Sequence, residues 1–431
     1  MEIKEFYKHF LKIRMVCTDS RKVVEGSIFF ALKGENFNGN KFAVKALEDG
    51  CLLAVVDEKI DVEDKRIVKV PDVLTYLQEL ANYHRSQFDI PVLAITGTNG
   101  KTTSKELINA VLSRKYNVIA TKGNLNNHIG VPLTLLNISD STQIAVVEMG
   151  ANHVGEIVAL CEIANPNFGL ITNIGNAHLE GFGSPEMVIK AKNELYRFIS
   201  LKKGVVFINI DDEVLYGLAE NLSKVTYGVS KLADVRGTAS GDIFSSLKWC
   251  AFPDVENWYY ADSKLVGGFN FYNIMAAISV GTHFGIEKDS INEALENYAP
   301  GLNRSQFVET EKNKVILDAY NANPDSMDAA INNFRQLNAE RKVVILGDMF
   351  ELGDYSARAH EDIVKAISES GFSEIYLAGS EFEKAAHNTS MHVFSDLQSL
   401  MDSIGENPIE DSLVLLKGSR GMEMERLLKV L

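Results

Sequence analysis

The sequence has few cysteines, no long apolar run and no excess of basic residues. Its four cysteines are widely spaced and form no CxxC pair; they are Cys17, Cys51, Cys161 and Cys250. They predict no disulfide framework and are expected to be buried thiols in a reducing compartment. No run approaches the roughly 18 apolar residues of a membrane span, and the first residues, MEIKEFYKHF, lack the apolar stretch of a signal peptide. These absences predict a soluble, cytoplasmic protein without membrane insertion.

Basic residues are outnumbered by acidic ones. The chain has 58 Asp and Glu against 43 Lys and Arg, a formal net charge of −15, and no basic stripe. The average field therefore repels phosphate backbones, which excludes nucleic acid as an expected partner. An anionic substrate must be held by a few positioned groups, such as helix N-termini, lysines, arginines or Mg²⁺.

Length and the order of apolar runs predict three α/β domains. A chain of 431 residues exceeds one ordinary core. Residues 1–88 mix short apolar runs with a helical pattern, as in a small α/β unit. Residues 89–300 alternate buried-type strands with helix-length segments, which indicates a mostly parallel sheet, with antiparallel edge strands near 229–266. The alternation restarts at 301–431 and ends in a last helix, so a separate Rossmann-like, doubly wound domain is expected there.

A phosphate-binding loop is the strongest chemical signal in the chain. The buried-type strand 92–96 runs into a loop and then a helical pattern, and the loop residues are Gly97, Thr98, Asn99, Gly100, Lys101, Thr102 and Thr103. Glycines let backbone N–H groups approach phosphates, Lys101 can reach the terminal phosphates, and Thr102 can ligate Mg²⁺. A plain strand-to-helix turn has no use for that Lys-Thr pair. The central domain is therefore expected to be a P-loop domain.

This loop has only two residues between its glycines, whereas the standard P-loop has four, and it resembles the loop of the Mur ligase and folylpolyglutamate synthetase superfamily. The resemblance extends to TDSR at 18–21, GNLNNHIGVP at 123–132, EMG at 148–150 and DAYNANP at 318–324. DAYNANP is similar to the D-alanyl-D-alanine-adding branch of the Mur ligases. The resemblance implies an ATP-dependent carbon–nitrogen ligase of peptidoglycan synthesis. Its expected substrates are UDP-N-acetylmuramoyl-tripeptide, activated as an acyl-phosphate, and D-alanyl-D-alanine.

The resemblance also implies a metal site. Glu148 ends a buried-type strand, where a doubly wound sheet meets its ligand, and His178 follows the next strand. One imidazole among oxygen ligands suits Mg²⁺ or Mn²⁺ better than Zn²⁺. Lys192 lies in an A-K-x-E stretch whose lysine is carbamoylated in this family, which makes it an anionic ligand; taken by itself, a lysine on an amphipathic helix is usually solvated. The implied metal ligands are thus Thr102, Glu148, His178 and the Lys192 carbamate, and Lys101 joins the last three as catalytic residues.

Further residues of the C-terminal half resemble nucleotide ligands of the family: Arg304, Asp318, Tyr320 and Asn321. Asp318 at a strand end can accept hydrogen bonds from ribose hydroxyls, and Tyr320 and Asn321 can pack on and bond to adenine. A plain strand-to-turn segment is the alternative. The chain departs from the family at residues 267–270, where GGFN replaces the usual G-x-H-N. The role of Phe269 in adenine binding or in a hinge is therefore open.

The residues implied in binding the other substrates are Ser20, Arg21, Asn126, Asn127, Lys417 and Arg420. The first pair would hold the uridine diphosphate end, although a surface turn with a paired arginine fits them equally well. The asparagines would line the substrate channel; an Asn-rich turn before a helix opened by Pro132 is the alternative. Lys417 and Arg420 are candidate anion-binding groups.

Three other functions remain open at this point. A folylpolyglutamate synthetase would use the same loop on a different acid, and a P-loop phosphotransferase or switch protein would transfer phosphate to a hydroxyl or to water. A ligase-like protein that only regulates would not need Lys101, Thr102, Glu148 and His178 intact. The protein is expected to be a monomer, and the sequence leaves open whether the third residue of the tripeptide is lysine or diaminopimelate.

Overall fold

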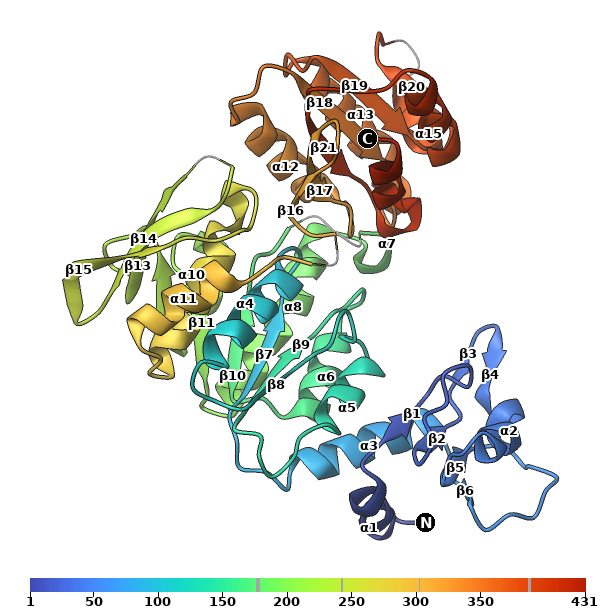
Figure 1. Ribbon diagram of the computed structural model, residues 1–431. Coiled ribbons are helices and arrows are strands. Elements are labelled where there is room, and N and C mark those ends of the chain that lie inside the picture. Colours follow the sequence, from blue (N-terminus) through green and yellow to red (C-terminus); the bar gives the residue numbers. More distant parts are fainter. Residues whose placement is uncertain (176–178, 242, 302, 387–388) are drawn as a thin grey trace.

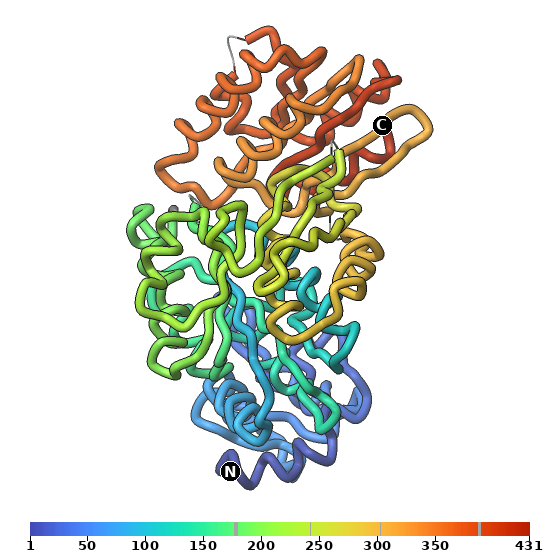
Figure 2. Tube along the Cα trace, turned by 90° about the vertical axis from the view of Figure 1, so that its left-hand side faces the viewer, coloured from blue at the N-terminus to red at the C-terminus, as the bar shows by residue number. Residues whose placement is uncertain are grey.

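The computed structural model describes residues 1–175, 179–241, 243–301, 303–386 and 389–431. Within these residues the strands form sheets of four, nine and six strands in chain order, with a separate two-stranded hairpin. The sheets follow one another along an elongated molecule, with the N-terminal sheet at one end and the C-terminal sheet at the other (Figures 1 and 2). None of the helices among the described residues combines the length and the apolar composition that a membrane span requires.

The N-terminal sheet is parallel and has the strand order β1-β2-β5-β6. Its elements are α1 (Ile3–Ile13), β1 (Val16–Cys17), β2 (Ile28–Phe30), the hairpin β3 (Lys33–Gly34) and β4 (Phe37–Asn38), the 3₁₀ segment η1 (Gly39–Phe42), α2 (Ala43–Glu48), β5 (Leu53–Val56) and β6 (Ile67–Lys69). Short apolar runs of residues 1–88 form the strands β2, β5 and β6. Helix α1, whose buried Phe6, Tyr7 and Phe10 share one helical face, was not predicted from the sequence.

Helix α3 (Val73–Arg85) fastens this unit to the central domain. It begins where the Asp72 side chain accepts the Thr75 N–H at 2.7 Å. Near its end, the buried His84 bonds to the Tyr7 hydroxyl of α1 at 2.9 Å and to the Ile138 carbonyl oxygen at 2.8 Å. Burial lowers the pKa of His84, which favours a neutral ring that can accept one bond and donate the other. The N-terminal unit is thereby held at one end of the central sheet.

The central sheet has the order β15-β14-β13-β12-β11-β10-β7-β9-β8. Its strands are β7 (Val92–Thr96), β8 (Val118–Ala120), β9 (Ile144–Glu148), β10 (Phe168–Ile171), β11 (Val205–Asn209), β12 (Ser223–Gly228), β13 (Val235–Ser240), β14 (Ser246–Ala251) and β15 (Asp254–Ala261). All neighbours are parallel up to β13, and β13, β14 and β15 pair antiparallel. The expected antiparallel edge is confirmed.

Helices cover both faces of this sheet, and the central strand β7 is therefore buried on both sides. Val92 and Ala94 pack with one set of helices, and Leu93 and Ile95 with the other. The first set is α5 (Gly130–Leu135), α6 (Glu156–Ala164) and α8 (Pro185–Leu201); the second is α4 (Lys101–Leu112), α10 (Phe271–His283) and α11 (Lys288–Asn297). The shorter elements are α7 (Leu179–Phe182), α9 (Glu213–Leu218) and the 3₁₀ segment η2 (Gly268–Asn270).

The C-terminal sheet has the order β16-β17-β21-β18-β19-β20, with only its edge strand β16 antiparallel among the described residues. Its strands are β16 (Gln306–Glu309), β17 (Lys314–Asp318), β18 (Lys342–Gly347), β19 (Glu374–Ala378), β20 (His392–Phe394) and β21 (Leu413–Lys417). Helices α12 (Pro324–Gln336) and α13 (Ser356–Ser368) pack on one face, and α15 (Leu397–Glu406) packs on the other. Short elements are η3 (Gly353–Tyr355) and α14 (Ser380–Ala385). The expected doubly wound arrangement is confirmed.

The predicted last helix is wrong. The segment after β21 forms two short 3₁₀ pieces, η4 (Arg420–Met422) and η5 (Met424–Lys429). Glu423 between them has φ 51°, a left-handed conformation that interrupts a right-handed helix. Met424 and Leu427 still bury their side chains against the sheet, so the apolar pattern that suggested a helix serves the same packing.

Candidate active site

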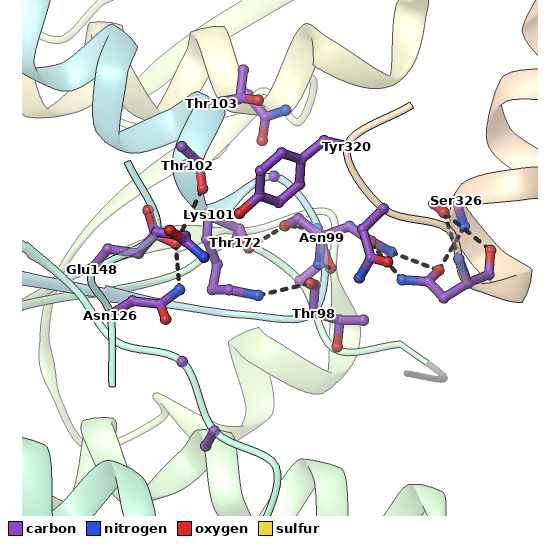
Figure 3. A pocket seen from close by; sticks show the side chains of 18 of the residues that line it. Thr98, Asn99, Lys101, Thr102, Thr103, Asn126, Glu148, Thr172, Tyr320 and Ser326 are labelled. Atoms are coloured by element: carbon purple, nitrogen blue, oxygen red, sulfur yellow. Dashed lines mark hydrogen bonds between the residues drawn. The ribbon is translucent and has the colours of Figure 1, made fainter. Parts of the chain in front are cut away.

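A cavity of about 990 Å³ opens between the central and C-terminal sheets and reaches Gln78 of α3. Many residues predicted from the sequence line it: Thr98, Asn99, Gly100, Lys101, Thr102, Thr103, Asn126, Asn127, Glu148, Arg304, Asp318, Tyr320, Asn321 and Lys417. Figure 3 shows the loop, Glu148 and Tyr320 around this space. Residues from two domains, more than 200 positions apart in the chain, thus meet at one site.

The phosphate-binding loop follows β7 and requires its two glycines. Gly97 has φ 144°, and a Cβ there would come within 2.0 Å of Thr172 Oγ1. Gly100 has φ 77°, and its Cβ would meet Asn273 Oδ1 at 2.4 Å. Both positions therefore exclude a side chain. The loop is also braced on the end of β10, where Asn173 Oδ1 accepts the Asn99 N–H at 2.9 Å.

Lys101 is folded back onto the loop. Its Nζ donates to the carbonyl oxygens of Gly97 at 2.7 Å and Thr98 at 2.9 Å. The pKa of this ammonium group is lowered to about 8, mainly by burial; the Glu148 charge raises it and the Arg304 charge lowers it. Lys101 thus donates to two backbone carbonyl oxygens with N–H groups that could otherwise bind a phosphate.

Glu148 lies at the end of β9 with its carboxylate buried (1% exposed). Oε1 accepts bonds from Thr102 Oγ1 at 3.1 Å and Asn126 Nδ2 at 2.8 Å (Figure 3). Oε2 accepts no hydrogen bond from the described residues. A buried carboxylate oxygen without a donor, beside a threonine hydroxyl, fits a hard divalent cation. His178, another of the predicted ligands, lies outside the described residues. Within the described residues, no three His, Cys, Asp or Glu side chains gather as a metal site.

Lys192 is buried on α8, only 2% exposed. Its Nζ lies 3.5 Å from the Ala151 carbonyl oxygen and 5.4 Å from the centre of the Phe182 ring. The pKa of Lys192 is lowered to about 7, mainly by burial and also by the charge of Lys101, against the charges of Glu156 and Glu194, which raise it. Lys192 is behind the cavity wall, which Ala151 lines. This is not a solvated lysine.

Asp318 ends β17 and is already paired. Its Oδ2 accepts a bond from Lys417 Nζ at 2.6 Å, and its Oδ1 accepts the Ser305 N–H at 3.3 Å. Lys417, at the end of the neighbouring strand β21, is 1% exposed and also donates to the Asn321 carbonyl oxygen at 3.3 Å. The candidate anion-binding lysine therefore orients the candidate ribose ligand.

Tyr320 contacts two arginines. The guanidinium carbon of Arg304 is 3.4 Å from the ring centre, and that of Arg420 is 5.1 Å away. Arg420 also donates to the Tyr320 hydroxyl at 3.2 Å. Nε of Arg304 is buried without a hydrogen bond among the described residues, and Arg304 also lines the cavity.

The other implied substrate ligands lie in different places. Ser20 and Arg21 do not line the cavity, and Arg21 pairs with Asp19 through two contacts of 2.9 Å with its side chain 85% exposed. Asn127 lines the cavity and accepts the Gly130 N–H at 2.9 Å at the start of α5. Phe269, which replaces the usual histidine, also lines the cavity.

Sequence reasoning missed three residues near the loop. Asn323 Nδ2 donates to Asn99 Oδ1 at 2.8 Å and so ties the loop to the C-terminal domain, while Asn323 also caps α12. Asn273 accepts a bond from Ser104 at 3.0 Å, and Lys105 is fully buried on α4. Two signals were available: the N-P-D-S order typical of a helix start, and the position of Lys105 on the buried stripe with Ile108 and Leu112.

Comparison with known proteins follows the same three-part order. Three family models match: "Mur ligase family, catalytic domain" at residues 12–85, "Mur ligase middle domain" at 95–281 and "Mur ligase, glutamate ligase domain" at 303–420. The chain belongs to the Mur ligase family. The expected enzyme class, an ATP-dependent ligase that forms a carbon–nitrogen bond, is confirmed with it.

Among curated Mur ligases, the chain is 35% identical to the UDP-N-acetylmuramoyl-tripeptide--D-alanyl-D-alanine ligase of Bacillus subtilis, over 97% of this chain and 93% of that one. A crystal structure of MurF from Acinetobacter baumannii is 32% identical with a TM-score of 0.87, covering 97% and 93% of the two chains. The MurF ligase of Thermotoga maritima in complex with ADP is 27% identical with a TM-score of 0.85, covering 97% of both.

Proposed function

We propose that this Mur ligase joins D-alanyl-D-alanine to UDP-N-acetylmuramoyl-tripeptide and converts ATP to ADP and phosphate in the same reaction. The observation that carries the proposal is the cavity in which the phosphate-binding loop and Glu148 face the DAYNANP strip, residues 318–324, across two domains. The names of full-length relatives at 30–35% identity supply the two substrates. A folylpolyglutamate synthetase activity is the weaker alternative.

The chemistry needs two anions to be held together. A terminal carboxylate oxygen of the tripeptide attacks the γ-phosphorus of ATP, the bond to the bridging oxygen of ADP breaks, and an acyl-phosphate forms. The amine of D-alanyl-D-alanine then attacks the acyl carbon, inorganic phosphate leaves, and the nitrogen loses a proton. In this proposal Lys101 turns from the Gly97 and Thr98 carbonyls to the γ-phosphate, and the amides of the loop hold the neighbouring oxygens.

The remaining ATP ligands are proposed on the C-terminal side. We assign the ribose hydroxyls to Asp318, which Lys417 orients at 2.6 Å, and the adenine to Tyr320 and Asn321. Arg304, whose buried Nε has no acceptor in the described part of the chain, is assigned to a phosphate. Arg420 and Lys417 support this strip by their contacts to Tyr320 and Asp318.

We propose Mg²⁺, replaceable by Mn²⁺, at Glu148 and Thr102, with His178 and a carbamate on Lys192 as further ligands. When bound, the ion neutralises charge on the phosphoryl group that is transferred. The pKa of about 7 at Lys192 supports the carbamate, because a neutral amine attacks CO₂ whereas an ammonium group does not. The charges of Glu156 and Glu194 favour the ammonium form and so oppose the carbamate. Their effect on the pKa is smaller than that of burial.

We also propose a division of work among three domains. Residues 1–88 would hold the uridine diphosphate end through Ser20 and Arg21, residues 89–300 would carry out phosphoryl transfer with Asn126 and Asn127 along the substrate, and residues 301–431 would close over ATP. Because the proposed substrates are cytoplasmic metabolites, we place the enzyme in the cytoplasm. We also propose that it is a monomer.

The test is release of phosphate from ATP by the purified protein with UDP-N-acetylmuramoyl-tripeptide, adding D-alanyl-D-alanine, D-glutamate or L-alanine in turn. Rapid release is expected only with D-alanyl-D-alanine, and both lysine- and diaminopimelate-containing tripeptides are offered. Release with a folate and glutamate instead, or release that needs no amine, would refute the proposal.

Replacing Asp318 by alanine is expected to raise KM for ATP by about tenfold or more, from loss of charge-assisted bonds to the ribose, with little change in KM for the dipeptide. Because Lys417 would lose its buried partner, the variant is also expected to lose about 3 kcal/mol of stability. The double variant Asp318→Ala, Lys417→Met separates the effects: it should regain stability and keep the high KM. Equal changes in both KM values would contradict a ribose contact.

A further inference from the structure

Lys105 is a fully buried lysine to which the proposed reaction gives no role. It lies on α4 one turn after Lys101, and its side chain is 0% exposed. A buried ammonium group is unfavourable unless it is paired, so its partners indicate what it does. Nζ donates to the carbonyl oxygens of Thr121 at 2.6 Å and Gly123 at 3.3 Å, and it lies 2.8 Å from Glu106 Oε1.

The same ammonium group faces Glu148. Its Nζ is 3.8 Å from Glu148 Oε2, the oxygen that accepts no hydrogen bond from the described residues. The other oxygen is held by Thr102 and Asn126 (Figure 3). Lys105 therefore supplies positive charge to the free oxygen without donating to it, and that oxygen remains open to a further ligand.

Lys105 also anchors the segment that carries Asn126. Thr121, whose carbonyl oxygen accepts from Lys105, has a hydroxyl that accepts the Glu148 N–H at 3.0 Å and an N–H that donates to Val146 at 3.0 Å. One ammonium group thus joins α4, the end of β8 and the end of β9. The distance between Glu148 and the phosphate-binding loop, residues 97–103, depends on these bonds.

We propose that Lys105 is a positioning residue that compensates the charge of Glu148 in the free enzyme and thereby couples divalent cation binding to ATP. The inference rests on the metal site of the proposed function. An ammonium group this close to Oε2 repels a cation that approaches the same oxygen. The phosphates of ATP add several negative charges, which outweigh that repulsion. The free protein should therefore bind the cation weakly, and the protein with nucleotide should bind it well.

The experiment measures Mn²⁺ binding to the full-length protein by electron paramagnetic resonance, with and without a non-hydrolysable ATP analogue. Lys105→Gln and Lys105→Met both remove the charge, and Gln retains an N–H donor. Either variant is expected to bind Mn²⁺ without nucleotide about tenfold more tightly than the parent, because one repelling charge is gone. The control is Lys122→Gln, which removes an exposed lysine from the same segment and should leave the affinity unchanged.

The direction of the change separates this role from simple support of the fold. A variant that has only lost structure would bind Mn²⁺ more weakly, and thermal unfolding reports that loss independently. Equal or weaker Mn²⁺ binding without nucleotide in the charge-removing variants, while the parent binds Mn²⁺ with the analogue, overturns the inference and leaves the proposed function standing. A parent that binds no Mn²⁺ with the analogue overturns the metal site itself.

Discussion

Ligation is expected to be abolished when Lys101 is replaced by alanine, while the fold is retained. The transferring phosphoryl group loses the ammonium group placed to meet it, and loss of one such preorganised donor reduces turnover by at least about a hundredfold. The lysine contributes little to the fold, because its bonds go to Gly97 and Thr98 carbonyl oxygens of a loop that already faces the cavity. Water can replace those bonds.

The measurement is phosphate release with all three substrates, together with thermal unfolding of the variant. Lys122→Ala is the control, because it removes an exposed lysine of the same domain. Lys101→Arg tests whether charge alone suffices; the longer, planar group is expected to remain poorly active. Activity of Lys101→Ala within about tenfold of the parent, on the order of 1.4 kcal/mol in the barrier, would contradict the phosphate-binding role.

Lys192→Ala is expected to be nearly inactive and to regain part of its activity with formate or acetate. If Lys192 stayed an ammonium group beside Mg²⁺, the two cations would repel by on the order of a few kcal/mol at an effective dielectric near 20. A carbamate removes that conflict and offers hard oxygen ligands. Truncating a side chain that is 2% exposed leaves a buried space in which a small carboxylate can replace the missing anion.

Lys190→Ala is the matched control, since Lys190 is exposed on the same helix. The carbamate itself is measured by ¹³C NMR of protein equilibrated with labelled CO₂; the parent should show a signal that Lys192→Ala lacks. A depressed amine pKa means that lowering the pH through about 7 protonates the amine, so this signal should fall as the pH falls. Near-parent turnover of Lys192→Ala, or an inactive variant that neither acid restores, would count against the carbamate.

The parts predicted well from the sequence are those with local causes. Buried-type runs become β7, β9, β10 and β11, because a parallel strand that is covered on both faces must be apolar throughout. The loop 97–103 was found because its glycines and its Lys-Thr pair have one chemical use. The alternation of these strands with helix-length segments along the chain also indicated a parallel sheet.

The errors have local causes as well. Helix α1 was not predicted because its apolar face is short, with Phe6, Tyr7 and Phe10 set among charged and polar residues. The last helix was wrong because an apolar pattern cannot reveal a left-handed residue such as Glu423. The roles of Ser20 and Arg21 stay predictions, as both lie away from the cavity.

The three-part α/β order, the phosphate-binding loop and the family resemblance can be predicted from the sequence, because each follows from neighbouring residues. Three pairings were not predictable and appear in the folded chain: Asp318 with Lys417, Asn99 with Asn323 and Glu148 with Lys105. Asp318 and Lys417 meet because the parallel strands β17 and β21 place their carboxyl ends at one edge. Glu148 meets Lys105 because β9 pairs with β7, which leads into α4, and Asn99 meets Asn323 where the central and C-terminal domains contact each other. A buried charge is unfavourable without a partner, and which charges are buried depends on the packing of the whole molecule.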